Sequence, residues 1–152
     1  PLYQQLSKIK KQLLPLLVSQ FIGSLTGILS VSYIAKWLGA SDAIIRSLAP
    51  KSVTTPIALE VSKTLHGITS LTVAAVIATG ILGSILGFKV LQWTGIKSPM
   101  GRGISLGTAS HALGIMAALN LSEKHAIYAS LGMIFNGVFT AILAPIVMPF
   151  IL

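Results

Sequence analysis

The sequence predicts an all-α polytopic membrane protein with two repeats, each a broken helix followed by a membrane span. Of the 152 residues, 53% are hydrophobic and only 9% are charged, whereas soluble domains carry roughly 25% charged residues. Three uncharged stretches exceed the roughly 20 apolar residues that a helix needs to cross the hydrocarbon core, namely residues 12–35, 64–88 and 126–152. Two further segments, residues 42–63 and 103–122, are interrupted near their centres by Pro, Gly or hydroxyl residues.

The composition argues against several classes of function. The net charge is +8, but the basic residues are sparse and separate long apolar runs, which is typical of cytoplasmic loops and not of a nucleic-acid-binding surface. The absence of cysteine excludes disulfides and thiolate chemistry. The three histidines lack metal-ligand spacing, and no catalytic constellation is present. We therefore expect no cofactor, no metal, no nucleic-acid partner and no enzymatic activity.

We expect residues 1–152 to form a single transmembrane domain, the C-terminal part of a longer chain, because the first residue is Pro1 and not an initiator Met. The first span, residues 12–35, follows a lysine cluster and precedes Gly39, a residue type favoured just past a helix end. Trp37 and Trp93 lie just beyond predicted helix ends, where interfacial aromatic residues belong. Ordinary packing is the alternative for both tryptophans.

The segment from residue 42 to residue 63 has two helical halves. Ser41 or Asp42 is suited to cap a first half over residues 43–49, and Pro50 must end it. Thr55 followed by Pro56 then predicts a capped second half over residues 56–65. In the segment from residue 103 to residue 122, the Gly and hydroxyl residues at positions 107–110 predict a corresponding interruption.

The two interrupted segments align on each other at an offset of 56 positions. Arg46 falls on Arg102, Ser52 on Thr108, Thr54 on Ser110, and Thr55 on His111. A long apolar span follows each segment, so residues 42–88 form repeat 1 and residues 98–152 form repeat 2. Paired Gly/Pro-interrupted segments in two halves of a membrane protein are the best sequence indication of a transporter site.

Two topologies fit these repeats. If residues 42–63 enter the membrane and return as a re-entrant hairpin, the cations at residues 8–11 and 89–102 face the same side, as the positive-inside rule favours. The repeats are then inverted. If the interrupted segments instead cross completely, the two cationic clusters face opposite sides.

The residues from Pro50 to Pro56 predict an anion site. A lysine at membrane depth is costly and usually functional, so Lys51 is suited to balance a substrate carboxylate, with Ser52, Thr54 and Thr55 as hydroxyl donors. Free N–H groups at the start of the second half-helix also favour a bound anion. In the alternative, Lys51 extends to the interface and the hydroxyls only cap a helix.

Thr108, Ser110 and His111 form the counterpart in the second repeat. His111 is a candidate to bond substrate or carry a proton, and a buried structural histidine is the alternative. Glu60 and Lys63 are spaced to pair on one helix face. Asn136 lies in the middle of the last span and is expected to bond across to another helix.

The stretches LAPKSVTTPIA (residues 48–58) and RGISLGTASHALG (residues 102–114) resemble the two signature stretches of the LrgB/CidB family, as does the opening PLY. The resemblance implies a multi-pass protein of the bacterial inner membrane, related to holin/antiholin-like modulators of murein hydrolase activity and cell lysis. Plastid relatives are linked to glycolate and glycerate exchange, and bacterial ones also to pyruvate. The motif positions are Lys51, Ser52, Thr54, Thr55, Thr108, Ser110 and His111.

We therefore expect a transporter of small organic anions, monocarboxylates such as glycolate, glycerate or pyruvate, with a midplane site at the broken helices. The alternative is a holin/antiholin-like modulator of lysis that acts by oligomerising with a small holin-like membrane protein. The expected partners are the anion, the lipid bilayer, further copies of the chain and this holin-like protein.

Overall fold

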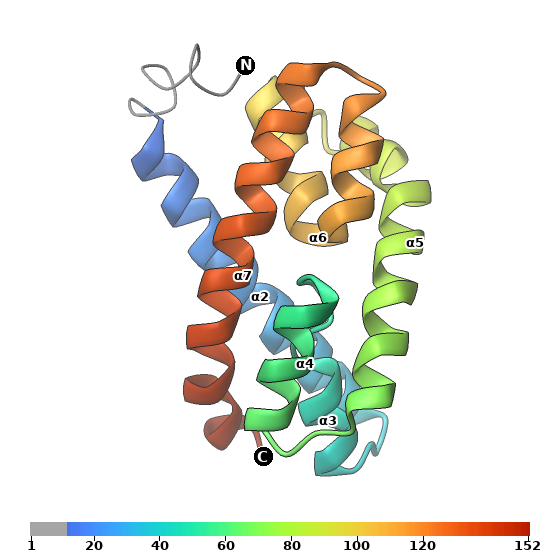
Figure 1. Cartoon of the computed structure of the whole chain (residues 1–152), viewed down its shortest axis with the longest axis vertical. Helices are drawn as coiled ribbons and strands as arrows, with labels where there is room; N and C mark the ends of the chain where they lie inside the picture. Colours follow the sequence, from blue (N-terminus) through green and yellow to red (C-terminus); the bar gives the residue numbers. More distant parts are fainter. Residues whose placement is uncertain (1–11) are drawn as a thin grey trace.

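The computed structural model describes residues 12–152, which are helical apart from short connections (Figure 1). Three helices are long and apolar enough to cross a membrane: α2 (Leu13–Trp37), α5 (Thr69–Trp93) and α7 (Glu123–Ile151). Between them lie α3 (Asp42–Leu48), α4 (Thr55–Thr64) and α6 (Pro99–Leu119). No strand occurs within these residues. The predicted all-α membrane class is confirmed.

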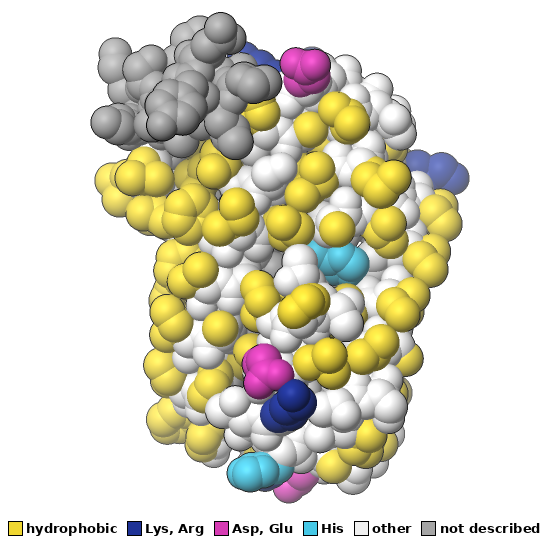
Figure 2. Space-filling view, in the orientation of Figure 1, with side chains coloured by type: hydrophobic (Ala, Val, Ile, Leu, Met, Phe, Trp, Pro, Cys, Tyr) yellow, Lys and Arg dark blue, Asp and Glu magenta, His cyan; other side chains and the backbone are white. Residues whose placement is uncertain are grey.

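The long helices turn apolar side chains outward, as helices in lipid do. Figure 2 shows these side chains spread over the visible face, with few charged groups among them. Trp37 and Trp93 are 85% and 84% exposed at the ends of α2 and α5, which is where an interface would lie. The second span begins at Thr69 and not at residue 64, because α4 continues to Thr64 and the chain then turns at His66, whose φ is 58°.

The first interrupted segment forms a hairpin. α3 ends at Leu48, where Pro50 prevents continuation because it has no N–H to donate. α4 then returns toward the end of the molecule from which α3 came (Figure 1). The expected cap at Thr55 is wrong by one residue: Thr54 is the N-cap, with φ −65° and ψ 148°, and its side chain makes no capping bond. Pro56 is tolerated because it still lies in the first turn.

Hydroxyl groups join this first hairpin to α5. The Thr72 hydroxyl lies 3.0 Å from the Ser47 carbonyl oxygen and 2.7 Å from the Ser62 hydroxyl, and the Ile68 N–H donates to the Ser47 hydroxyl at 2.6 Å. All three hydroxyl side chains are fully buried. Their bonds tie α3, α4 and α5 together at one end of the molecule.

The second interrupted segment reverses direction inside α6. In Figure 1 the chain of α6 runs inward from the end where α5 finishes and then returns to that end. A side-chain carbon added to Gly114 would overlap the carbonyl of Leu106, so the two arms lie in direct contact. The expected interruption at residues 107–110 is misplaced, because those residues keep helical angles and the reversal occurs at His111, with φ 43° and ψ −127°.

Glycines allow the first arm of α6 to approach its neighbours. A side-chain carbon at Gly107 would overlap the backbone carbonyl of Ala129 in α7, and one at Gly83 would overlap Ser110 from the side of α5. Close backbone approach through small residues is the usual way in which membrane helices pack. The hairpin is therefore held between α5 and α7.

Cationic residues lie near both ends of the molecule. The start of α7 lies beside the start of α2, because the Tyr128 hydroxyl donates to the Gln12 side chain at 2.8 Å. The start of α6 lies at the same end, because a side-chain carbon at Gly103 would overlap the His125 carbonyl of α7. Lys89, Lys97, Arg102 and Lys124 belong to this end, in the last turns of α5, the loop after it and the first turns of α6 and α7, whereas Lys36 and Lys63 lie in the last turns of α2 and α4 and Arg46 lies in α3. The lysines at positions 8, 10 and 11 lie outside the described residues.

Candidate functional site

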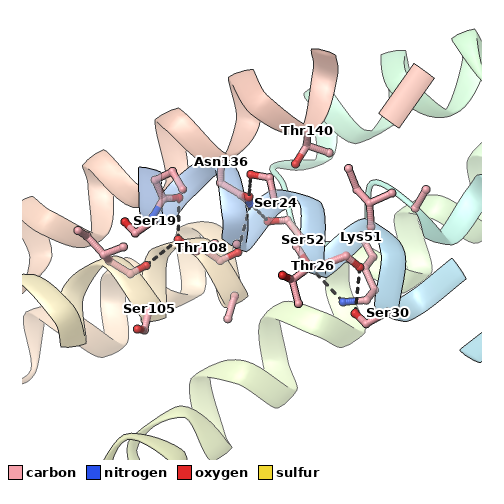
Figure 3. A pocket seen from close by; sticks show the side chains of 17 residues that line it. Ser19, Ser24, Thr26, Ser30, Lys51, Ser52, Ser105, Thr108, Asn136 and Thr140 are labelled. Carbon is pink, nitrogen blue, oxygen red and sulfur yellow. Dashed lines mark hydrogen bonds between the residues drawn. The ribbon is translucent and has the colours of Figure 1, made fainter. Parts of the chain in front are cut away.

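The two hairpin tips meet in the middle of the molecule on one side-chain amide. Asn136 Nδ2 in α7 donates to the Ser52 carbonyl at 2.8 Å and to the Thr108 carbonyl at 3.2 Å. The Ser24 hydroxyl in α2 donates to Asn136 Oδ1 at 2.7 Å, as Figure 3 shows. Asn136 is 1% exposed. As expected, it bonds across to other segments, and it uses both ends of its amide to do so.

A cavity of about 510 Å³ lies between these tips, α2 and α7. Its wall is mostly polar or small: hydroxyl groups from all these elements, the Asn136 amide and the Gln20 amide face it. Among residues 12–152, Lys51 is the one charged residue that lines it. The hydroxyl-bearing residues of the wall are Ser19, Ser24, Thr26, Ser30, Ser52, Ser105, Thr108 and Thr140.

In the part of the chain that the structure describes, no carboxylate lies beside Lys51. Its ammonium donates to the Ser52 hydroxyl at 3.2 Å, and within residues 12–152 the single ion pair joins Glu60 to Lys63 at 2.7 Å. That exposed pair is the one predicted from the spacing of these two residues. The Ser52 hydroxyl is therefore the one side-chain hydrogen-bond partner of Lys51 within residues 12–152, and no negative charge of these residues balances it.

A second cavity of about 520 Å³ lies between α5 and the first arm of α6. Its wall is mainly apolar, with Leu82, Leu86 and Val90 from α5. Lys51, Ser105 and Ala109 line this cavity as well as the first one. Lys51 is therefore the cation common to both cavities.

The structure brings together only some of the residues predicted for the site. Lys51, Ser52 and Thr108 line the first cavity, and Ser110 lines the second. Thr54 and Thr55, the N-cap and the first residue of α4, line neither cavity.

His111 also lines neither cavity. Its ring is 7% exposed, and Nε2 lies 3.0 Å from the carbonyl oxygen of Val76 in α5. A side-chain carbon at Gly80 would come within 2.6 Å of the ring, so glycine makes room for it. This geometry matches the structural alternative for His111: the residue fastens the reversal of α6 to α5.

Similarity to known proteins shows the family of this chain. The LrgB-like family matches residues 1–150. The chain belongs to this family. Proteins named "Antiholin-like protein LrgB" from Bacillus cereus strain B4264 and Bacillus anthracis strain A0248 are each 36% identical to it over 151 residues. The alignment covers 99% of this chain and 66% of each relative's length. No solved structure matches the chain.

Residues 48–58 and 102–114, which carried the resemblance to the family, contain the two hairpin tips. Gln20 and Ser24 complete the first cavity from α2 and were not among the residues predicted for the site. Both belong to a buried stripe at every fourth position of that helix, which also includes Leu16, Ile28 and Ser32. The sequence does contain a signal for this polar face: polar residues recur at every fourth position of an otherwise apolar span. Residues four apart share one helix face.

Proposed function

We propose that this chain carries small organic anions across a membrane through the cavity between the hairpin tips. The observation that carries the proposal is Lys51: it is half-buried, lines both cavities and has no carboxylate partner among residues 12–152. A charge placed so deep is costly unless a ligand compensates it. Monocarboxylates such as glycolate, glycerate or pyruvate supply one negative charge and suit the single cation.

We also propose that the two hairpins are inverted repeats. Adding the offset of 56 to the bounds of α4 and α5 gives residues 111–120 and 125–149, close to the second arm of α6 and within α7. The first hairpin enters from one end of the molecule and the second from the opposite end (Figure 1). Transporters built from inverted repeats hold their substrate where such interrupted segments meet, and the Asn136 bridge lies at that place.

We propose a location in the bacterial inner membrane, as membership of the family suggests, and the distribution of charge indicates the orientation there. The end that carries Lys89, Lys97, Arg102 and Lys124 would face the cytoplasm under the positive-inside rule. Both hairpins would then be re-entrant, the first from outside and the second from the cytoplasm, with α2, α5 and α7 crossing completely.

The names of the relatives favour a second candidate function, and they favour it more directly than transport. Proteins 36% identical to this chain are called antiholin-like. In this candidate the chain modulates murein hydrolase activity and cell lysis by assembling with further copies or with a small holin-like membrane protein. Neither candidate is an enzyme, and neither requires a cofactor.

Uptake of labelled carboxylate into liposomes that contain the full chain separates the two candidates. Transport requires uptake that saturates with concentration, because the cavity is a specific site. Lys51→Ala should abolish it, whereas Lys51→Arg should keep part of it because the positive charge remains. Lys97→Ala is the matched control, since Lys97 is exposed and lines neither cavity.

Two results would contradict parts of this proposal. If well-folded Lys51→Ala protein takes up as much carboxylate as the unaltered chain, Lys51 does not bind the substrate. Uptake that never saturates, for any small monocarboxylate, would favour the lysis-modulating candidate, which needs no anion site.

A further inference from the structure

The second cavity is mainly apolar, yet a cation lines it. The cavity opens at the surface of the molecule between α5 and α6, where Leu82, Leu86 and Val90 are each about half exposed. Lys51 lines the same cavity. Its volume of about 520 Å³ lies within the usual range of small-molecule pockets, roughly 300–1,000 Å³. A pocket with one charge and a long apolar wall matches a ligand with one charge and an apolar tail.

The charged end of this cavity lies at the hairpin tips. Lys51 belongs to the tip of the first hairpin, and its ammonium donates to the Ser52 hydroxyl at 3.2 Å. The Asn136 amide bonds the carbonyl groups of Ser52 and Thr108 and so holds this tip against the tip of the second hairpin. Lys51 therefore marks the end of the cavity that lies nearest the middle of the molecule.

The other end of the cavity lies farther along α5. A side-chain carbon at Gly83 would overlap Ser110, next to the reversal of α6, whereas one at Gly87 would overlap Leu106, about one turn earlier in α6. The first arm of α6 and α5 thus run antiparallel, and the cavity between them extends from the tip toward Leu91. Leu91 and Leu106 also belong to one buried hydrophobic cluster. The wall away from the tip therefore offers hydrocarbon contacts to a ligand.

We infer that the second cavity binds an amphipathic monocarboxylate, with its carboxylate at Lys51 and its single apolar tail along Leu82, Leu86 and Val90. No carboxylate among residues 12–152 pairs with Lys51, and an anion stabilises a lone cation at membrane depth. From Leu82 to Val90 the helix rises roughly 12 Å, which suits a tail of medium length. This ligand reaches Lys51 from the second cavity, whereas the small acids proposed as substrates reach it from the first, so the two compete for one cation.

Binding measured without uptake tests this inference. The full chain in phosphatidylcholine nanodiscs is dialysed against labelled octanoate or butanoate, and binding to empty nanodiscs is subtracted. Burying one methylene strengthens binding about fourfold. Octanoate has four more methylenes than butanoate, so burial of half of them predicts a dissociation constant about tenfold lower or less. Octanol keeps the tail but has no charge, so it should displace octanoate at least about tenfold less well.

Variants of Lys51 and Leu86 test the two ends of the ligand separately. Lys51→Ala should abolish saturable binding of both acids. Leu86→Trp fills part of the apolar wall, so octanoate should bind no more than about twofold tighter than butanoate. Ile85→Trp is the matched control, because Ile85 is the next residue of the same helix, is 64% exposed and lines neither cavity.

If Leu86→Trp does not fold, Leu86→Ala decides, with Ile85→Ala as its control. The smaller side chain removes part of the contact with the tail, so the ratio of the two dissociation constants should fall about threefold. An unchanged ratio in the variant that folds would refute the inference.

Three other results would also overturn the inference: no saturable binding of octanoate above that of empty nanodiscs, equal displacement by octanol, or undiminished binding in Lys51→Ala. Failure of transport is distinguishable from these results, because no uptake is measured. A chain that binds octanoate through Lys51 and Leu86 but never takes up a small acid in liposomes would overturn the proposed transport and leave this site in place.

Discussion

Replacing Asn136 with leucine tests whether one amide holds the hairpin tips together. Leucine fills a similar volume but removes the bonds to Ser52 and Thr108 and the bond from Ser24. Interhelical hydrogen bonds in membrane proteins average about 0.6 kcal/mol, and a buried polar group left unpaired costs about 1–3 kcal/mol. With three bonds lost and two carbonyls deprived of their donor, we expect Asn136→Leu to lower the free energy of unfolding by about 2–4 kcal/mol.

An aspartate at the same position separates hydrogen bonding from shape. Its carboxylate still accepts a bond from Ser24 but has no proton to donate to the carbonyls of Ser52 and Thr108. The carboxylate oxygens then face the carbonyl oxygens of Ser52 and Thr108 in a buried environment. We therefore expect Asn136→Asp to be at least as destabilising as Asn136→Leu.

Unfolding by a denaturing detergent in mixed micelles, followed by tryptophan fluorescence, measures these differences. Ser130→Ala is the matched control in α7, because the Ser130 hydroxyl bonds only the Ala126 carbonyl of its own helix, at 2.9 Å. This control should lose no more than about 0.5 kcal/mol. If Asn136→Leu unfolds at the same detergent concentration as Ser130→Ala, the amide does not hold the tips and the reasoning is wrong.

Three further predictions concern the backbone and the topology. Gly107→Ala should lower the free energy of unfolding by about 2 kcal/mol or more, because its methyl group overlaps the Ala129 carbonyl; an unchanged unfolding midpoint would contradict this close approach. His111→Gly should be about 1 kcal/mol less destabilising than His111→Ala in the same assay, since glycine adopts a φ of 43° without strain, and the opposite order would argue against that conformation. Single cysteines at Gln5 and Ser98 should both be protected from an impermeant thiol reagent in intact cells, because both are expected on the cytoplasmic side; labelling of one alone would favour complete crossing by the interrupted segments.

The sequence by itself determined the features that depend on neighbouring residues. The all-α membrane class and the three spans follow from the length and composition of uncharged stretches. The end of α3 follows from Pro50, which cannot continue a helix wherever it is placed. The pairing of Glu60 with Lys63 follows from their spacing on one face. Each of these features depends only on residues that are near one another in the sequence.

The tertiary structure alone decided which polar groups meet at the site. Gln20 bonds to Thr108 across 88 positions, and Asn136 bonds to Ser24 across 112 and to Ser52 across 84. Helical periodicity shows that such residues share a buried face, but it does not say which segment lies opposite. His111 illustrates the same limit: its place in the repeat favoured the site, yet the reversal of α6 turns its ring to Val76 in α5. The partner of a buried polar side chain depends on how distant segments pack, and that packing is a property of the whole chain.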